Sequence, residues 1–134
     1  MPETSAPPQY VEKEVVKEEL EKGGKDLMII DLRKDDFVGG KIKGSLNIPA
    51  QSIYYSVDDL YQLAENSHKK TIYLHCVSSA DRATRTFGWF KDAADNHSGS
   101  VDVKIIKGGI LGWVAGGKEY TDLMDEYAPE IFGR

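Results

Sequence analysis

A cysteine and an arginine stand close together near the middle of the chain: Cys76 and Arg82, with five residues between them. An apolar run of strand type at residues 71–74 precedes the cysteine, and a helical pattern follows the arginine. Five intervening residues allow the backbone to curl so that several N–H groups point inward, and the amino end of the following helix adds positive potential there. The spacing therefore predicts a pocket for a tetrahedral oxyanion such as a phosphoryl group.

The same surroundings favour the charged form of Cys76. A helix amino terminus and a nearby guanidinium lower the pKa of a thiol from about 8.5 into the range of about 3.5 to 7.5, so we expect a thiolate at neutral pH. The planar donor fork of Arg82 can bind two phosphoryl oxygens and stabilise the charge that spreads over them. In-line attack by the thiolate would give a thiophosphoryl intermediate, which water then hydrolyses.

Neighbouring polar residues are assigned weaker roles. His75 could orient the loop through hydrogen bonds, although a buried histidine bonded to the backbone is at least as good an interpretation, and we expect no general base there. Ser78 and Ser79 could donate to the thiolate or simply hold the loop.

The sequence does not identify the acid that would protonate the leaving group. Asp81 and either Asp35 or Asp36 are candidates only because phosphoryl transfer benefits from such a group. The chain has one cysteine and its histidines are scattered, so we expect no metal site.

The elements that must position this segment alternate between strand and helix patterns. Continuous apolar runs at residues 27–30 and 71–74 are typical of strands buried on both faces. Shorter strands are predicted at residues 45–49 and 101–105, and helices at residues 12–22, 56–64, 83–94 and 118–127. Ser56 and Asp59 resemble a capping box at the start of the second helix. The alternation predicts an α/β domain with a parallel sheet.

Length and charge limit the remaining possibilities. The 134 residues have room for one domain, which we place at residues 10–134, behind a polar, proline-rich leader at residues 1–9 that we expect to be disordered. The net charge of −5 argues against a nucleic-acid partner. No apolar run is long enough to span a bilayer and no secretory signal is present, so we expect no membrane contact and a cytoplasmic location that could extend to the nucleus.

Three segments resemble a rhodanese-type domain. A predicted strand ends in an Asp-x-Arg pattern at Asp31 and Arg33, and residues 39–49 resemble the Gly-His-Ile-x-Gly-Ala pattern, with Lys41 in place of the histidine. Residues 107–109 followed by Trp113 resemble the closing Gly-Gly-x-x-x-Trp. The resemblance covers nearly all of residues 10–113, and it implies a three-layer fold with a central, mostly parallel sheet flanked by helices.

The length of the loop narrows this resemblance. Sulfur-transferring rhodaneses typically place one residue fewer between the cysteine and the arginine. The longer loop is similar to that of the dual-specificity phosphatases that control cell division, and of the eukaryotic arsenate reductases and small fungal phosphatases related to them. The resemblance implies that Cys76 is the nucleophile, that Arg82 binds the anion, and that the intervening amides form its cradle: Val77, Ser78, Ser79, Ala80 and Asp81.

Some positions differ from the family pattern or carry a structural role in it. Ala83 and Thr84 follow the arginine where the family usually has Gly-Pro, but alanine suits the first turn of a helix. In rhodanese-like domains, residues such as Asp31 and Arg33 usually form a structural ion pair. We therefore assign them, together with His75, a supporting role.

The expected function is that of a cysteine-dependent phosphatase of the protein tyrosine or dual-specificity type. Its substrate would be a phosphorylated protein or a small oxyanion, and it would need no cofactor. The alternative is an arsenate reductase, which would need an external thiol such as glutathione, with glutaredoxin as a partner, because Cys76 has no second cysteine to resolve it. Sulfur transfer from thiosulfate and noncatalytic binding of phosphorylated partners rank lower.

Overall fold

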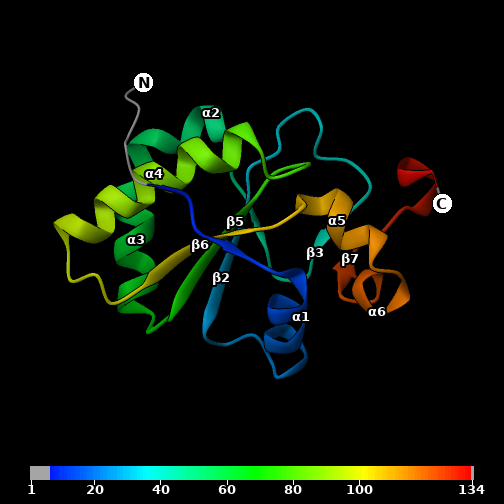
Figure 1. Cartoon of the computed structure of the whole chain (residues 1–134), viewed down its shortest axis with the longest axis horizontal. Helices are drawn as coiled ribbons and strands as arrows, with labels where there is room; N and C mark the ends of the chain where they lie inside the picture. The colour runs from blue at the N-terminus through cyan, green and yellow to red at the C-terminus, as the bar shows by residue number, and fades with distance from the viewer. Residues whose placement is uncertain (1–6, 134) are drawn as a thin grey trace.

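A parallel sheet forms the centre of the fold (Figure 1). The computed structural model describes residues 7–133, so most of the predicted leader lies outside the described residues. The sheet has five strands, and each neighbouring pair is parallel: β1 (Tyr10–Val11), β6 (Asp102–Ile106), β5 (Thr71–His75), β2 (Leu27–Asp31) and β4 (Leu46–Asn47), in this spatial order. The predicted parallel sheet is confirmed.

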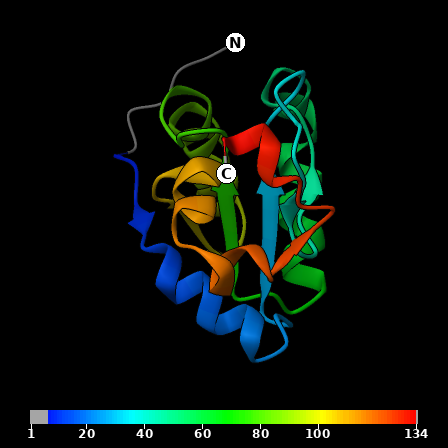
Figure 2. The ribbon, with the colours of Figure 1, turned by 90° about the vertical axis from the view of Figure 1, so that its right-hand side faces the viewer.

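Helices cover both faces of this sheet, which gives the chain three layers (Figure 1). One face carries α2 (Ala50–Ile53), the 3-10 turn η1 (Tyr54–Ser56), α3 (Val57–Asn66) and α4 (Asp81–Asn96). The other face carries α1 (Lys13–Glu21), α5 (Gly109–Ala115) and α6 (Lys118–Thr121). Figure 2 looks onto this second side, with β2 and β5 running side by side. The predicted α/β layering is confirmed.

Side chains of the two central strands alternate between the two cores. In β2, Met28 and Ile30 pack with the helices of the first face, while Leu27 and Ile29 pack with those of the second. Every residue of β2 and of β5 is buried. Both faces of the sheet are covered, which explains why these strands read as continuous apolar runs rather than as alternating ones.

The long helix after the Cys76 loop buries one side along its length. Ala83, Phe87, Phe90 and Ala94 are each 4% exposed or less, and all belong to the first core. These positions recur every three or four residues and so form one stripe along the helix. The stripe fixes the rotation of α4, and therefore the direction in which its first turn faces.

The C-terminal part of the chain differs from the prediction. The helix expected at residues 118–127 ends at Thr121, and the chain continues into β7 (Met124–Asp125), which pairs antiparallel with β3 (Lys41–Ile42) before the 3-10 turn η2 (Pro129–Phe132). The carbonyl oxygen of Tyr120 accepts a hydrogen bond from the Trp113 indole at 2.8 Å. This tertiary bond occupies a carbonyl at the end of α6 and ties that helix to α5.

Two helix starts differ from the prediction. Helix α5 was not predicted, and Gly108, with a left-handed φ of 83°, is its cap. Ser56 does precede α3, but its side chain makes no capping hydrogen bond. The predicted capping box is therefore wrong, although a helix does begin where it was expected.

The carboxyl ends of β2 and β5 meet at one edge of the sheet. Asp31, the last residue of β2, lies opposite His75, the last residue of β5. Loops that follow neighbouring parallel strands open at the same edge, which is where α/β proteins bind ligands. Residues 32–40 and 76–80 are therefore brought together there, although they are far apart in the sequence.

Neighbouring residues of α5 provide a test of the layering. Ile110 is 1% exposed and Leu111 is 50% exposed. We expect Ile110→Ala to lower the free energy of unfolding by about 2–5 kcal/mol, because it leaves a cavity in the second core. Leu111→Ala should change it by less than about 1 kcal/mol. Urea unfolding followed by tryptophan fluorescence measures both, and equal losses would contradict the burial of this face of α5.

Candidate active site

The Cys76 loop links the end of β5 to the start of α4. Cys76 is 3% exposed and follows directly after the strand, and α4 begins at Asp81, one residue before Arg82. Within the loop, Ser79 has a left-handed φ of 59°. A left-handed residue in such a loop lets successive N–H groups converge, which is the geometry of an anion nest. The structure thus gathers the predicted loop residues at the amino end of α4.

The first turn of α5 fixes the direction of this loop. The N–H of Ile110 donates to the Cys76 carbonyl oxygen at 3.1 Å, and the N–H of Leu111 donates to the Val77 carbonyl oxygen at 3.1 Å. In a planar trans peptide the carbonyl and the next N–H point in opposite directions. Because α5 holds these two carbonyls, the N–H groups of Val77 and Ser78 face away from α5.

Gly109 is needed for this close approach of α5. Its φ is 60°, and a Cβ atom added there would lie 2.5 Å from the Cys76 carbonyl oxygen and would also overlap the Val77 carbonyl. Only glycine combines that backbone angle with that contact at no steric cost. In the sequence the glycine pair is visible only through the family pattern, which does not predict its contact with the loop.

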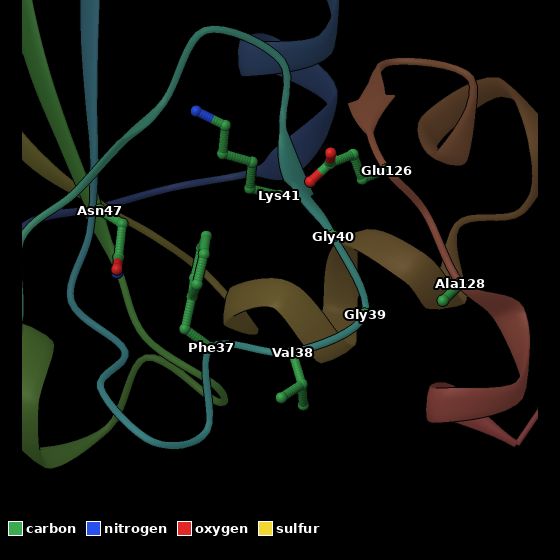
Figure 3. A pocket seen from close by; sticks show the side chains of 8 residues that line it. All are labelled: Phe37, Val38, Gly39, Gly40, Lys41, Asn47, Glu126 and Ala128. Carbon is green, nitrogen blue, oxygen red and sulfur yellow. The ribbon is translucent and has the colours of Figure 1, made fainter.

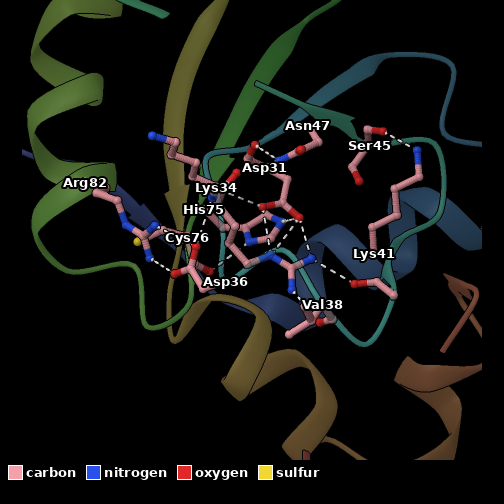
Figure 4. A network of polar contacts seen from close by, with 12 residues as sticks. Asp31, Lys34, Asp36, Val38, Lys41, Ser45, Asn47, His75, Cys76 and Arg82 are labelled. Atoms are coloured by element: carbon pink, nitrogen blue, oxygen red, sulfur yellow. Dashed lines mark hydrogen bonds and ion pairs between the residues drawn. The ribbon is translucent and has the colours of Figure 1, made fainter. Parts of the chain in front are cut away.

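Arg82 is paired with a carboxylate from the other loop (Figure 4). Its Nη1 donates to Asp36 Oδ1 at 3.0 Å and its Nη2 donates to Asp36 Oδ2 at 2.5 Å, so the contact is bidentate. The hydrogen bonds from Arg82 lower the pKa of Asp36 to about 2. The pKa of Arg82 is raised, chiefly by Asp36, with a smaller contribution from Cys76. Cys76, Arg82 and Asp36 therefore form one electrostatic unit.

The loop of residues 32–40, which carries Asp36, is held by a buried ion pair. The Arg33 side chain donates to Asp31 Oδ2 at 2.7 Å, and both side chains are 1% exposed or less. Arg33 also donates to the carbonyl oxygens of Val38 at 3.1 Å and Gly40 at 2.8 Å. The pair thus fixes residues 32–40 from inside.

His75 lies beneath the loop and bridges the two strands. Its Nδ1 lies 3.0 Å from the Cys76 carbonyl oxygen, and since a carbonyl only accepts, this nitrogen carries the proton. Its Nε2 lies 3.7 Å from Asp31 Oδ2 and makes no hydrogen bond with the described residues. Burial lowers the pKa of His75 below its usual 6.5. His75 is therefore a neutral, buried support for the Cys76 carbonyl.

The remaining predicted residues occupy less restricted positions. Ser78, Ala80 and Asp81 are exposed, and so is Asp35. Ser79 is 4% exposed, and its hydroxyl has no hydrogen-bond partner within residues 7–133.

Among the described residues there is no cluster of three or more histidine, cysteine or acidic side chains that could hold a metal ion. Within the same part of the chain, no helix is long and apolar enough to cross a membrane.

Two hollows border these loops. A small pocket of about 200 Å³ lies beside the first turns of α4 and is lined by Ala50, Gln51, Asp81, Arg82, Arg85 and Thr86. A larger one of about 450 Å³ is lined mainly by residues 37–41, together with Asn47, Glu126 and Ala128 (Figure 3). The smaller pocket includes the anion-binding candidate Arg82. The larger one contains none of the residues predicted to carry chemistry.

Gly109→Ala tests whether α5 sets the direction of the loop amides. The substitution should weaken the binding of tungstate, a tetrahedral oxyanion, by on the order of tenfold or more, because the displaced loop loses hydrogen bonds to a charged ligand. Gly44→Ala is the matched control, since Gly44 also has a positive φ, 78°, but no atom within 4 Å of the added Cβ. Calorimetric titration measures the affinity. Equal affinities in the two variants would contradict the role of Gly109.

The buried His75 should make stability depend on pH. Its pKa in the folded chain is below the unfolded value of 6.5, so the unfolded chain binds the additional proton as the pH falls below 6.5. The free energy of unfolding should then decrease below pH 6.5, by up to about 1.4 kcal/mol per pH unit. His75→Asn should reduce this slope, whereas His68→Asn, at an exposed position, should not. Urea titrations between pH 7.5 and 5 measure the slope, and an unchanged slope in His75→Asn would refute the assignment.

The sequence of this chain matches a known family of domains. Residues 12–116 match the sequence pattern of the rhodanese-like domain. The dual specificity phosphatase ibp1 of Schizosaccharomyces pombe is 30% identical over 76 residues, which cover 57% of this chain and 54% of that protein. The aligned part of the chain thus spans about half the length of this curated relative.

Solved structures agree on the fold. An As-Sb reductase from Leishmania major superimposes with a TM-score of 0.77 at 23% identity, over 88% of this chain and 85% of that one. A yeast protein tyrosine phosphatase of the rhodanese family also reaches 0.77, at 16% identity, over 96% of this chain and 99% of its own. At such identities the likeness establishes a shared architecture. Together with the match over residues 12–116, it leads to one conclusion: the chain belongs to the rhodanese-like domain family.

Proposed function

We propose that this chain is a cysteine-dependent phosphatase that hydrolyses phosphoryl esters, of the protein tyrosine or dual-specificity type. The observation that carries the proposal is the placement of Cys76 at the base of a loop that ends at the amino terminus of α4, with the Arg82 guanidinium beside it. A buried nucleophile, convergent amides and an arginine fork are the parts that phosphoryl transfer needs.

In the proposed reaction, Cys76 Sγ attacks the phosphorus atom from the base of the loop. The S–P bond forms, the P–O bond to the leaving group breaks on the opposite side, and a proton is added to the departing oxygen. Water then attacks the thiophosphoryl group, releases inorganic phosphate and regenerates the thiolate. Arg82 and the loop amides would stabilise the three equatorial oxygens in both steps.

Two lines of support come from outside the site geometry. The curated relative is a dual specificity phosphatase, and its similarity to this chain supports a phosphorylated protein as the substrate. The five residues between Cys76 and Arg82 make a ring larger than the one typical of sulfur transfer. Both favour a tetrahedral oxyanion over a single transferred sulfur atom.

Arsenate reduction is the second candidate, because arsenate has the shape and charge of phosphate and would fit the same loop. Cys76 is the only cysteine, so an external thiol such as glutathione, with glutaredoxin, would have to complete the reduction. The same protein preparation can be assayed for both reactions.

Substitution at Cys76 and Arg82 tests the proposed chemistry. Cys76→Ser should lower kcat for p-nitrophenyl phosphate by at least about 10³-fold, since it removes the nucleophile. Arg82→Lys should lower kcat/KM by about 10²- to 10³-fold, since a point charge replaces the two-pronged fork. Initial rates of phosphate release measure both effects.

Each substitution has a matched control. Ser67→Ala changes an exposed serine at the end of α3, outside the loop, and Arg85→Lys changes an exposed arginine one helical turn from Arg82. Both should retain most of the activity. Full activity in Cys76→Ser would rule out the proposed mechanism. Cysteine-dependent oxidation of glutathione by arsenate, without phosphate release, would assign the chain to the reductase reaction instead.

A further inference from the structure

The arginine expected to bind the oxyanion already has a ligand from this chain. The Asp36 carboxylate contacts both terminal nitrogens of Arg82 at 3.0 and 2.5 Å, as a bound phosphoryl group would contact them with two of its oxygens. No other carboxylate in residues 7–133 forms an ion pair with Arg82. An oxyanion that enters the loop and binds the same Nη1–Nη2 edge of Arg82 must therefore displace Asp36.

Asp36 lies toward the solvent side of this unit. Its side chain is 41% exposed and that of Arg82 is 34% exposed, whereas Cys76 is 3% exposed at the base of the loop. In-line displacement places the leaving group opposite the attacking sulfur, which is the open side of the site. The partly exposed Asp36 carboxylate is therefore accessible from the open side of the site.

The backbone that carries Asp36 is firmly held, although its side chain is accessible. The N–H of Val38 donates to the Asp36 carbonyl oxygen at 3.0 Å, and the N–H of Phe37 donates to the Lys34 carbonyl oxygen at 3.1 Å, while the carboxylate itself accepts from the Lys34 N–H at Oδ1, at 2.9 Å. The next residue, Phe37, places its ring 4.8 Å from the Arg33 guanidinium, which is itself buried. The carboxylate can therefore change partner by a side-chain movement while its backbone stays in place.

We propose that Asp36 holds Arg82 while the site is empty, is displaced from it by the incoming phosphoryl group, and then protonates the leaving oxygen. This inference rests on the proposed phosphatase function. The displaced carboxylate has lost a cation and stands beside a phosphoryl group that carries negative charge, and both changes favour its protonated form. Asp36 therefore takes up a proton from the solvent, and in this way the substrate produces the acid that its own cleavage needs.

Bonds and protons balance in both halves of the proposed reaction, the formation of the thiophosphoryl group and its hydrolysis. As Cys76 Sγ bonds to phosphorus, the P–O bond breaks and the proton of the Asp36 carboxyl moves to the departing oxygen, which leaves as an alcohol or phenol. Asp36 is then a carboxylate, and it can take a proton from the water that attacks the thiophosphoryl group. After phosphate has left, the Asp36 carboxyl releases this proton to the solvent and returns to Arg82 as a carboxylate.

The other two candidates for the acid are less well placed. Asp81 is the first residue of α4, and Asp35 precedes Asp36, and both are exposed. Neither carboxylate forms a hydrogen bond or ion pair with Arg82 in the described part of the chain. Asp35→Asn is therefore a matched control for Asp36→Asn: it makes the same change of charge one residue away.

The first test measures displacement with tungstate as the probe. Asp36→Asn should bind tungstate at least about threefold more tightly than Asp35→Asn does, because the anion no longer competes with a charged, bidentate partner. Calorimetric titration of the whole chain gives both affinities. Equal affinities in the two variants would overturn the displacement of Asp36.

The second test separates acid catalysis from a structural role by changing the leaving group. p-Nitrophenolate departs without protonation, whereas phenolate needs a proton. Asp36→Asn should lower kcat/KM, which reports the step in which the leaving group departs, by about 10²-fold or more for phenyl phosphate, with a much smaller change for p-nitrophenyl phosphate, and Asp35→Asn should lower neither. Equal losses on both substrates would overturn the acid role.

Failure of the proposed function is distinguishable from failure of this inference. If the wild-type chain hydrolyses neither ester, the phosphatase proposal falls and the acid role with it, while the tungstate comparison still decides whether Asp36 competes for Arg82. If the wild-type chain hydrolyses both esters through Cys76 and Asp36→Asn does so equally well, the phosphatase proposal stands and the inference about Asp36 is wrong.

Discussion

The candidate site depends on the direction of two carbonyl groups, those of Cys76 and Val77. Both accept hydrogen bonds from the first turn of α5, and the Cys76 carbonyl also accepts one from His75. Because each peptide is planar, the N–H groups that follow are turned away from α5. A segment more than thirty residues later in the sequence thus decides whether the loop can present donors to an anion. The requirement for glycine at position 109 follows from the same contact, since α5 reaches those carbonyls only where no Cβ intervenes.

The buried pair of Asp31 and Arg33 serves the second loop in a comparable way. Such a pair is weak support for stability, because desolvation of two charges offsets much of their attraction. Its Arg33 guanidinium also binds the Val38 and Gly40 carbonyl oxygens, so it organises backbone that has no regular secondary structure. The result is a defined position for Asp36 opposite Arg82. Neither residues 32–40 nor residues 76–80 form regular secondary structure. Neighbouring groups hold each loop in place, and the ion pair between Asp36 and Arg82 joins the two loops.

The sequence predicted elements whose pattern is local and missed those that depend on distant contacts. The apolar runs of β2 and β5 and the buried stripe of α4 are properties of consecutive residues, so periodicity was sufficient. Strand β7 is two residues long and exists through its pairing with β3, and no local pattern distinguishes it from the end of a helix. The site shows the same division. The spacing of Cys76 and Arg82 was visible in one segment, whereas Asp36 contacts Arg82 across 46 positions and could be named only as one of several acids.

Departures from the family pattern fall on positions where this structure supplies a substitute contact. After Arg82, where the family usually has Gly-Pro, Thr84 donates both its N–H and its hydroxyl to the Ala80 carbonyl oxygen, at 3.0 and 2.7 Å, so the first turn of α4 is intact. Lys41, in place of histidine, donates to the Ser45 carbonyl oxygen at 2.8 Å within its own loop. Neither change reaches Cys76 or the fork of Arg82. Any difference in the site between this chain and its relatives is therefore expected in residues 32–40, which face Arg82. In that segment the Asp36 carboxylate sets the charge that an incoming oxyanion meets.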